Sequence, residues 1–260
     1  MSPRQGRTVA VMQPTYLPWI GYLDLMDQCD VFVLLDCVQF EQRSWQQRNR
    51  VKIASGEAWL RVPVLTKGRR DQRVCEVELD RSSNFREKHL ATIRHGYARA
   101  AHYANYAPQL AAVLARKHDR LVDLNADLIE LMRGALGITT PLIRSSTIAA
   151  DGHRVTRLIS ICSELGAKCY LSPLGSKPYI EENDAFRDHG IELRYHQYEH
   201  PVYPQLHGRF LSHLSAVDLL LNAGHESLAI LQSGRRPSWL PARRPRRSQV
   251  RLRVSPYADV

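Results

Sequence analysis

The sequence lacks the features of membrane, exported and metal-binding proteins. No apolar run approaches the roughly 18 residues that a membrane-spanning helix needs. The basic start of the chain is followed by too few apolar residues for the core of a signal peptide. The five cysteines form no CxxC pair and are odd in number, which disfavours a zinc site or a disulfide framework. We therefore expect a cytoplasmic protein with no membrane span and no bound metal.

Positive charge is scarce in the body of the chain and concentrated at its end. Residues 1–234 hold 28 Lys and Arg against 25 Asp and Glu, whereas the last 26 residues hold eight arginines and one aspartate. This last stretch also contains several prolines and has no helical period, so we predict a disordered basic tail over residues 235–260. Because positive and negative charges nearly balance in residues 1–234, we do not expect this part of the chain to bind nucleic acid. The tail either solubilises the protein or docks on an acidic partner.

Strand-like and helix-like patterns alternate along most of the chain. RTVAVM (7–12) and VFVLLD (31–36) indicate buried strands, and a helical pattern lies between them at 21–29. Further strands are expected at 58–65 and 74–79. A strand–helix–strand order is typical of parallel sheets with crossover helices. We predict an α/β fold with a mainly parallel sheet and flanking helices.

A helix-rich segment interrupts this alternation. Residues 85–136 show helical periodicity, with a break expected near Pro108. We therefore divide the chain into four parts. These are an N-terminal α/β part that carries the main site (1–84), a helix-rich segment (85–140), a C-terminal α/β part (141–234) and the tail (235–260).

Polar and aromatic side chains gather after the first two predicted strands. Parallel sheets bind ligands at the carboxyl ends of their strands. Gln13, Tyr16 and Trp19 follow the first strand, and Arg48 and Asn49 belong to QRSWQQRNR after the second. Arginine and carboxamide groups suit phosphate or carboxylate recognition. We expect these residues to bind substrate, although each also suits an ordinary packing or surface role.

Several long segments resemble the WbqC-like family. They are MQPTYLPWIGYLDLMDQCDVFVLLDCVQFEQRSWQQRNRVK, SELGAKCYLSPLGSKPYIEE, HPVYPQ and LSAVDLLLNAG. The resemblance spans roughly residues 8–224 and leaves the tail outside. It implies a biosynthetic transferase that moves an acyl or aminoacyl group onto a small-molecule amine to form an amide. With Cys37 as a nucleophile, the donor would be a thioester, of CoA or of the phosphopantetheine of an acyl carrier protein, and no cofactor is required.

Three residues are candidates for the catalytic steps. Cys37 follows Asp36 at the end of the second strand. In the family that this chain resembles, the position of Cys37 is more often Asp or Asn. A thiol at this position could act as the catalytic nucleophile. The alternative is that Cys37 is a small buried residue with no part in the chemistry. Asp36 is a candidate base, and His200 in YEHPVYPQ is a candidate proton shuttle. Asp218 is either a second base or an anchor for a loop.

Three further residues are expected to bind substrate. Lys177 lies in the loop SPLGSKPY, which suits either a phosphate at a helix N-terminus or an ordinary turn. Tyr203 and Gln205 lie in the family-like motif HPVYPQ.

A fainter resemblance leaves a second function open. Met12–Leu23 is similar to the strand–HxGH–helix turn of nucleotidyltransferases, with Trp19 and Tyr22 at the two histidine positions and Gly21 between them. A nucleotide- or nucleotide-sugar-binding enzyme is therefore an alternative. A noncatalytic partner in a biosynthetic complex is a third.

Overall fold

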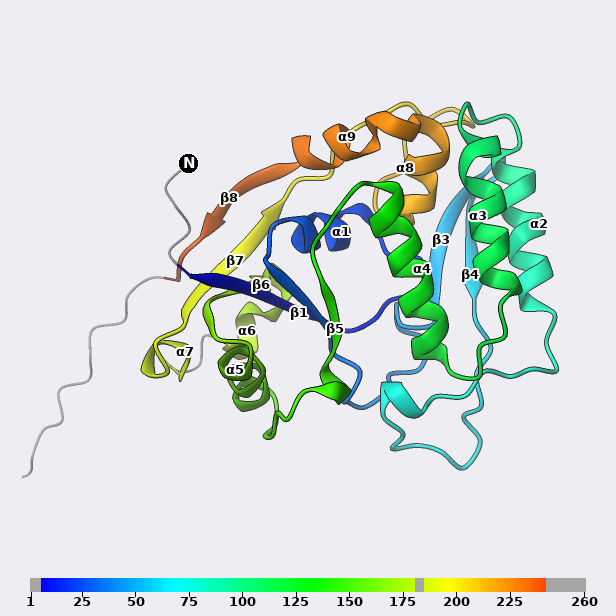
Figure 1. The fold of residues 1–260 in the computed structure, drawn as a ribbon. Helices are drawn as coiled ribbons and strands as arrows, with labels where there is room; N and C mark the ends of the chain where they lie inside the picture. The colour runs from blue at the N-terminus through cyan, green and yellow to red at the C-terminus, as the bar shows by residue number, and fades with distance from the viewer. Residues whose placement is uncertain (1–5, 181–184, 242–260) are drawn as a thin grey trace, which may run out of the picture.

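A computed structural model describes residues 6–180 and 185–241, and it has a layered α/β architecture (Figure 1). Within these ranges the main sheet has six strands in the order β5-β2-β1-β6-β7-β8. The first five run parallel, and β8 pairs antiparallel with β7. The prediction of an α/β fold with a mainly parallel sheet is confirmed. The strands of the sheet are β1 (Arg7–Met12), β2 (Val31–Leu34), β5 (Leu142–Arg144), β6 (Ala167–Pro173), β7 (Glu192–Tyr198) and β8 (Arg235–Trp239).

Helices cover both faces of this sheet, and a separate hairpin lies beside it (Figure 1). The hairpin consists of β3 (Arg48–Ile53) and β4 (Gly56–Arg61). The helices are α1 (Ile20–Asp27), α2 (Phe85–Tyr97), α3 (Tyr103–Ala115), α4 (Leu121–Ala135), α5 (Val155–Glu164), α6 (Lys177–Ile180), α7 (Ala185–Asp188), α8 (Ala216–Ala223) and α9 (Ser227–Ser233).

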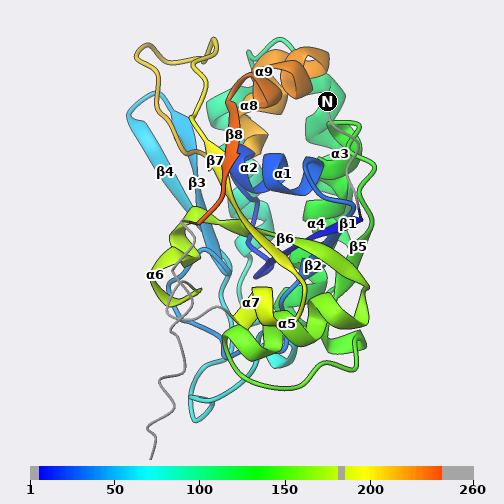
Figure 2. The same cartoon turned by 90° about the vertical axis from the view of Figure 1, so that its left-hand side faces the viewer.

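The central strands are apolar on both faces because each face supports its own core. Successive side chains of a strand point to opposite sides. Ala10 and Phe32 therefore belong to the core shared with α1, α4 and α8, whereas Val9 and Val33 belong to the core shared with α5 and α7. Figure 2 shows α1 and α5 on opposite sides of the sheet. This double burial explains the unbroken apolar run of β2.

The sheet has a topological switch point between β1 and β6. The chain leaves β1 toward β2 on one side, and later returns to β6 and β7 on the other. Loops at the carboxyl ends of β1 and β6 diverge at such a point, and this is where open α/β sheets bind ligands. The segment after β1 is QPTYLPW, one of the two stretches in which we predicted a site.

Two local predictions are wrong. The helical break expected near Pro108 is absent, because Pro108 lies inside α3. The helical segment is interrupted instead between α2 and α3 and between α3 and α4. Packing of α3 against α4 and α8 outweighs the hydrogen bond that proline removes. The strand expected at 74–79 contains only a short 3-10 helix, Val74–Glu76. The apolar pattern of residues 74–79 arises because Val74 and Val77 are buried in an irregular segment. The backbone N–H of Val74 there donates to the Val38 carbonyl oxygen.

The start of the predicted tail is part of the sheet. Residues Arg235–Trp239 form β8, so these residues are a strand rather than a disordered segment. Arg235 Nε donates to Asp24 Oδ1 at 2.6 Å, which ties β8 to α1. Residues 242–260, which hold the remaining arginines of the tail, lie outside the described residues.

Candidate active site

A cleft of about 240 Å³ opens at the carboxyl end of β1, beside the switch point. Three parts of the chain form its walls: the β1–α1 turn, the start of the hairpin and the loop that precedes α8. Its lining residues are Met12, Thr15, Trp19, Tyr22, Trp45, Asn49 and His213. The walls are therefore mainly aromatic and apolar, with a few polar groups, which is the usual composition of a small-molecule site.

The β1–α1 turn has an unusual backbone that is fixed by close packing. Leu17 is fully buried and has a φ of +47°, a conformation that costs a branched residue free energy. The indole of Trp19 lies directly against Gly21, where an added Cβ would be 2.2 Å from the ring. The Asn49 side chain donates to the Leu17 carbonyl oxygen at 2.7 Å and to the Tyr16 carbonyl oxygen at 3.2 Å. These contacts hold Trp19 in the cleft wall.

Two hydroxyl groups in this wall have no partner among the described residues. The Thr15 Oγ1 and Tyr22 Oη atoms are both buried and make no hydrogen bond. Burial raises the pKa of Tyr22 well above its ordinary value, so this group stays a protonated donor. Buried hydroxyls in proteins are normally paired. The two groups are therefore available to a ligand in the cleft.

Two histidines stack with Trp19 beside the cleft. The ring centroid of Trp19 is 5.1 Å from that of His213 and 6.2 Å from that of His200, and the two imidazoles are 5.0 Å apart. His213 lines the cleft and has a φ of +58°. His200 is half-buried behind these two rings. The loop that carries the predicted proton shuttle His200 therefore brings His213 into the cleft wall and His200 against the same indole.

The contacts of His200 define which ring nitrogen can accept a proton. Its Nδ1 lies 2.8 Å from the Pro201 carbonyl oxygen and must donate there, while its buried Nε2 has no partner in the described part of the chain. Burial lowers the pKa of His200, and His213 lowers it further. Burial also lowers the pKa of His213, as does the charge of Arg50. Both rings are therefore neutral at pH 7.

A buried carboxylate anchors the loop that carries these histidines. Asp218 on α8 is fully buried and accepts hydrogen bonds from Tyr97 Oη at 2.7 Å, Tyr203 Oη at 2.8 Å and Gln205 Nε2 at 2.7 Å. Lys52 Nζ donates to Gln205 Oε1 at 3.1 Å. Asp218 thus acts as an anchor. Tyr203 and Gln205, predicted to bind substrate, lie in this network rather than in the cleft wall.

Asp36 and Cys37 form a different cluster with residues after β5. Fully buried Asp36 accepts from the Ser146 backbone N–H at 2.8 Å and from Ser146 Oγ at 2.7 Å, and its Oδ1 lies 2.9 Å from Ser145 Oγ. Cys37 Sγ lies 3.1 Å from Ser145 Oγ and 3.2 Å from Arg157 Nη1. Both carboxylate oxygens are engaged in holding the turn after β5. A role for Asp36 as a base stays a prediction.

The structure does not bring Cys37 and His200 together. Cys37 follows β2 and His200 follows β7, and β1 and β6 lie between these two strands. Three strand spacings separate β2 from β7, or about 14 Å. The hydrogen bonds of Cys37 and the ring contacts of His200 also involve different residues. A direct Cys37–His200 nucleophile–base pair is therefore not supported by this geometry.

The remaining predicted residues occupy three kinds of place. Gln13 accepts from buried Gln46 Nε2 at 2.8 Å, beside the cleft, while Tyr16 is fully buried with its Oη 2.7 Å from His89 Nδ1. Arg48 lies on the hairpin, with its guanidinium carbon 4.5 Å from the ring centroid of Trp59. Lys177 Nζ lies 4.0 Å from the ring centroid of Trp239 on β8. None of these four lines the cleft, although Gln13 lies between the lining residues Met12 and Thr15 in the chain.

Sequence reasoning missed Thr15 and His213. Thr15 lies inside QPTYLPW, where the prolines and aromatics were more conspicuous. His213 directly precedes the family-like segment LSAVDLLLNAG, and this position was the signal that could have found it. Neither an unpaired hydroxyl nor a ring stack between distant segments has a sequence signature.

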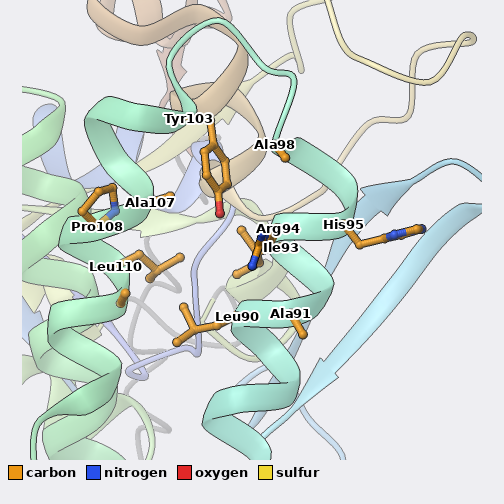
Figure 3. A pocket seen from close by; sticks show the side chains of 11 residues that line it. Leu90, Ala91, Ile93, Arg94, His95, Ala98, Tyr103, Ala107, Pro108 and Leu110 are labelled. Atoms are coloured by element: carbon orange, nitrogen blue, oxygen red, sulfur yellow. The ribbon is translucent and has the colours of Figure 1, made fainter.

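A larger cleft, of about 780 Å³, lies between α2 and α3 (Figure 3). Its walls are mainly apolar, with Arg94, His95 and Tyr103 as their polar groups. It is lined by none of the predicted site residues. We therefore place the candidate site at the smaller cleft.

Neither a metal site nor a membrane helix is found in residues 6–180 and 185–241. No group of three or more His, Cys, Asp and Glu side chains there could hold a metal ion. Within the same ranges, no helix combines the length and the apolar character needed to cross a bilayer.

Comparison with known proteins gives a family. The model of the WbqC-like protein family matches residues 13–230. The uncharacterized protein Rv1507c of Mycobacterium tuberculosis is 34% identical to this chain over 223 residues, which are 85% of this chain and 96% of the relative. No solved structure matches. The matched residues include every lining residue of the cleft except Met12, and the chain belongs to the WbqC-like protein family.

Proposed function

We propose that this protein transfers an acyl or aminoacyl group from a thioester to the amine of a small molecule, in the cleft beside Trp19. The observation that carries the proposal is the pair of neutral histidines, one in the cleft wall and one stacked behind it. Amide formation from an amine requires a base that removes a proton, and a neutral imidazole suits that task near pH 7.

The groups present in the wall support the following reaction. The amine nitrogen attacks the thioester carbonyl carbon, and the carbon–sulfur bond breaks when the tetrahedral intermediate collapses. His213 takes the proton from the amine and returns it to the leaving thiolate. The unpaired hydroxyls of Thr15 and Tyr22 donate hydrogen bonds to the oxyanion of the intermediate. The apolar walls exclude water, which would otherwise hydrolyse the thioester.

We favour direct transfer over a covalent acyl-enzyme at Cys37. The sulfur of Cys37 contacts Ser145 and Arg157, Cys37 does not line the cleft, and three strand spacings separate its strand from the one that precedes His200. A cysteine nucleophile normally works with an adjacent base. The direct route needs only groups that surround one cleft.

The test measures thiol release and amide formation from acyl-CoA and acyl-carrier-protein donors with a panel of amines. Replacement of the base, in His213→Gln, should lower kcat/KM about 100-fold or more. Cys37→Ser should retain activity within about threefold, because it removes no group from the cleft. A stable acyl adduct that is absent from Cys37→Ser would replace direct transfer by the covalent route. Folded protein that releases no thiol from any donor would contradict acyl transfer itself.

A nucleotide-binding enzyme is the second candidate. The observation in its favour is the position of the β1–α1 turn at the switch point of the sheet. The space over Gly21, however, is filled by the Trp19 indole. Thermal shift with ATP and with a nucleotide sugar tests this candidate, because a ligand that binds only the folded state raises the Tm.

A further inference from the structure

The outer face of the β3–β4 hairpin carries an unusual set of side chains next to the cleft. Cross-strand partners share a face in an antiparallel pair. The register pairs Arg48 with Arg61 and Arg50 with Trp59, so these four residues share the face. Trp45 precedes β3 and stacks on Trp59. We call these five residues the hairpin platform.

The charge of the platform is unbalanced. Arg48 and Arg61 lie directly opposite each other, an arrangement in which like charges destabilise a sheet. Arg50 is paired with Glu57 at 2.7 Å. Neither Arg48 nor Arg61 contacts a carboxylate among the residues that the structure describes. The Arg48 guanidinium lies over the Trp59 ring at 4.5 Å, a contact that leaves its charge unneutralised, so the two positive charges on one face favour an anion.

The aromatic part of the platform is exposed rather than buried. Trp45 and Trp59 are 48% and 46% exposed, and their rings stack at 5.7 Å with an interplanar angle of 28°. Large aromatic side chains are usually far more buried than this. Trp45 also lines the cleft, so the platform continues from the cleft to the surface.

We propose that the hairpin platform binds the phosphorylated adenosine of a CoA donor. This inference rests on the proposed function and names its donor. The purine stacks on the exposed indoles, and the phosphates pair with Arg48 and Arg61. The pantetheine arm then passes Trp45 and carries the thioester into the cleft. A carrier protein has no adenosine for this platform, so the platform selects CoA over a carrier-protein thioester.

Binding is measured directly, without turnover, by titrating the full-length protein with adenosine 3′,5′-bisphosphate and following tryptophan fluorescence. Saturable quenching is expected. The double variant Arg48→Gln/Arg61→Gln should raise the Kd about tenfold or more. The matched control is Arg69→Gln, because Arg69 is a surface arginine paired with Glu78 elsewhere. Absence of saturable binding, or an equal Kd in the double variant and the control, overturns the proposal.

Kinetics separate this inference from the proposed function. In the double variant the KM for acyl-CoA should rise about tenfold, while the KM for acyl-pantetheine stays unchanged. Transfer activity without bisphosphate binding overturns the platform and leaves the proposed function standing. Bisphosphate binding that depends on the two arginines, in a protein that transfers no acyl group, supports the platform and overturns the proposed function.

Discussion

The imidazole of His200 stacks on the indole of Trp19, with ring centroids 6.2 Å apart and an interplanar angle of 15°. This contact joins the loop after β7 to the turn after β1. It also shields His200 from water, and burial is the main cause of its lowered pKa. The same indole packs on Gly21 and on His213, so one side chain sets the surroundings of both histidines.

The pH dependence of activity should report these neutral histidines. A base must be unprotonated, so kcat/KM calculated per neutral amine should rise with pH through a pKa below 6.5 and then stay constant at pH 7–8. Trp19→Ala removes the indole that stacks on both imidazoles and so increases their contact with water, which should raise their pKa and move the acid limb to higher pH. The pH–rate profiles of the wild type and of Trp19→Ala measure this shift. Coincident profiles would show that the rate depends on another base.

A methyl group on Gly21 should disturb the cleft. The added Cβ would be 2.2 Å from the Trp19 ring, so Gly21→Ala must displace the indole. We expect a loss of stability of about 1–3 kcal/mol and a strong loss of activity. Gly134 on α4 is the matched control, because nothing lies within 4 Å of its added Cβ. Gly134→Ala should raise stability by about 0.5–1 kcal/mol and leave activity unchanged. Urea unfolding and kcat/KM of both variants test the pair, and equal effects would contradict the steric argument.

The sheet was predictable because its signals are local. The apolar runs of β1 and β2 are continuous in the sequence, and both strands are covered on both faces. The turn QPTYLPW was also recognisable, since its density of prolines and aromatics is unusual. It supplies Thr15 and Trp19 to the cleft.

The relative placement of the candidate catalytic residues was not predictable, because it depends on strand order. Cys37 and His200 both follow strands, yet β1 and β6 separate those strands. His213 reaches the cleft only because the segment before α8 returns to the β1–α1 turn, where Ala216 N–H bonds to the Pro18 carbonyl oxygen. Contacts between such distant segments have no periodicity that a single sequence displays.

The Asp218 network should control both stability and activity. Asp218→Asn replaces one acceptor oxygen by an amide group that faces the hydroxyl of Tyr203 or Tyr97. A buried mismatch of this kind should cost about 2–4 kcal/mol. Tyr203→Phe, which removes one donor, should cost about 1–2 kcal/mol. Because the network anchors the loop that holds His213, kcat should fall in both variants in the same order. Urea unfolding and steady-state kinetics measure the two effects. A variant that loses stability with an unchanged kcat would show that the network does not position His213.

Protonation of His89 should destabilise the protein in mild acid. His89 on α2 is buried, with its Nδ1 2.7 Å from Tyr16 Oη and its Nε2 3.1 Å from the Arg61 carbonyl oxygen. Burial lowers the pKa of His89 to about 4. The unfolded chain therefore binds this proton near pH 6.5 and the folded chain only near pH 4, so the free energy of unfolding falls as the pH drops across that window. This single group should remove up to about 3 kcal/mol, and nothing further below pH 4, where both states are protonated.

Urea unfolding of the wild type and of His89→Gln at several pH values between 4 and 7 measures this contribution. The variant keeps a polar side chain at the position but has no proton to bind, so its stability should change less across the window. The difference between the two proteins should be largest at pH 7 and smallest near pH 4. A difference that stays constant with pH would show that His89 binds protons equally in the folded and unfolded states. Tyr16 belongs to the same β1–α1 turn as Trp19, so protonation of His89 should also weaken the contact that holds this turn in place.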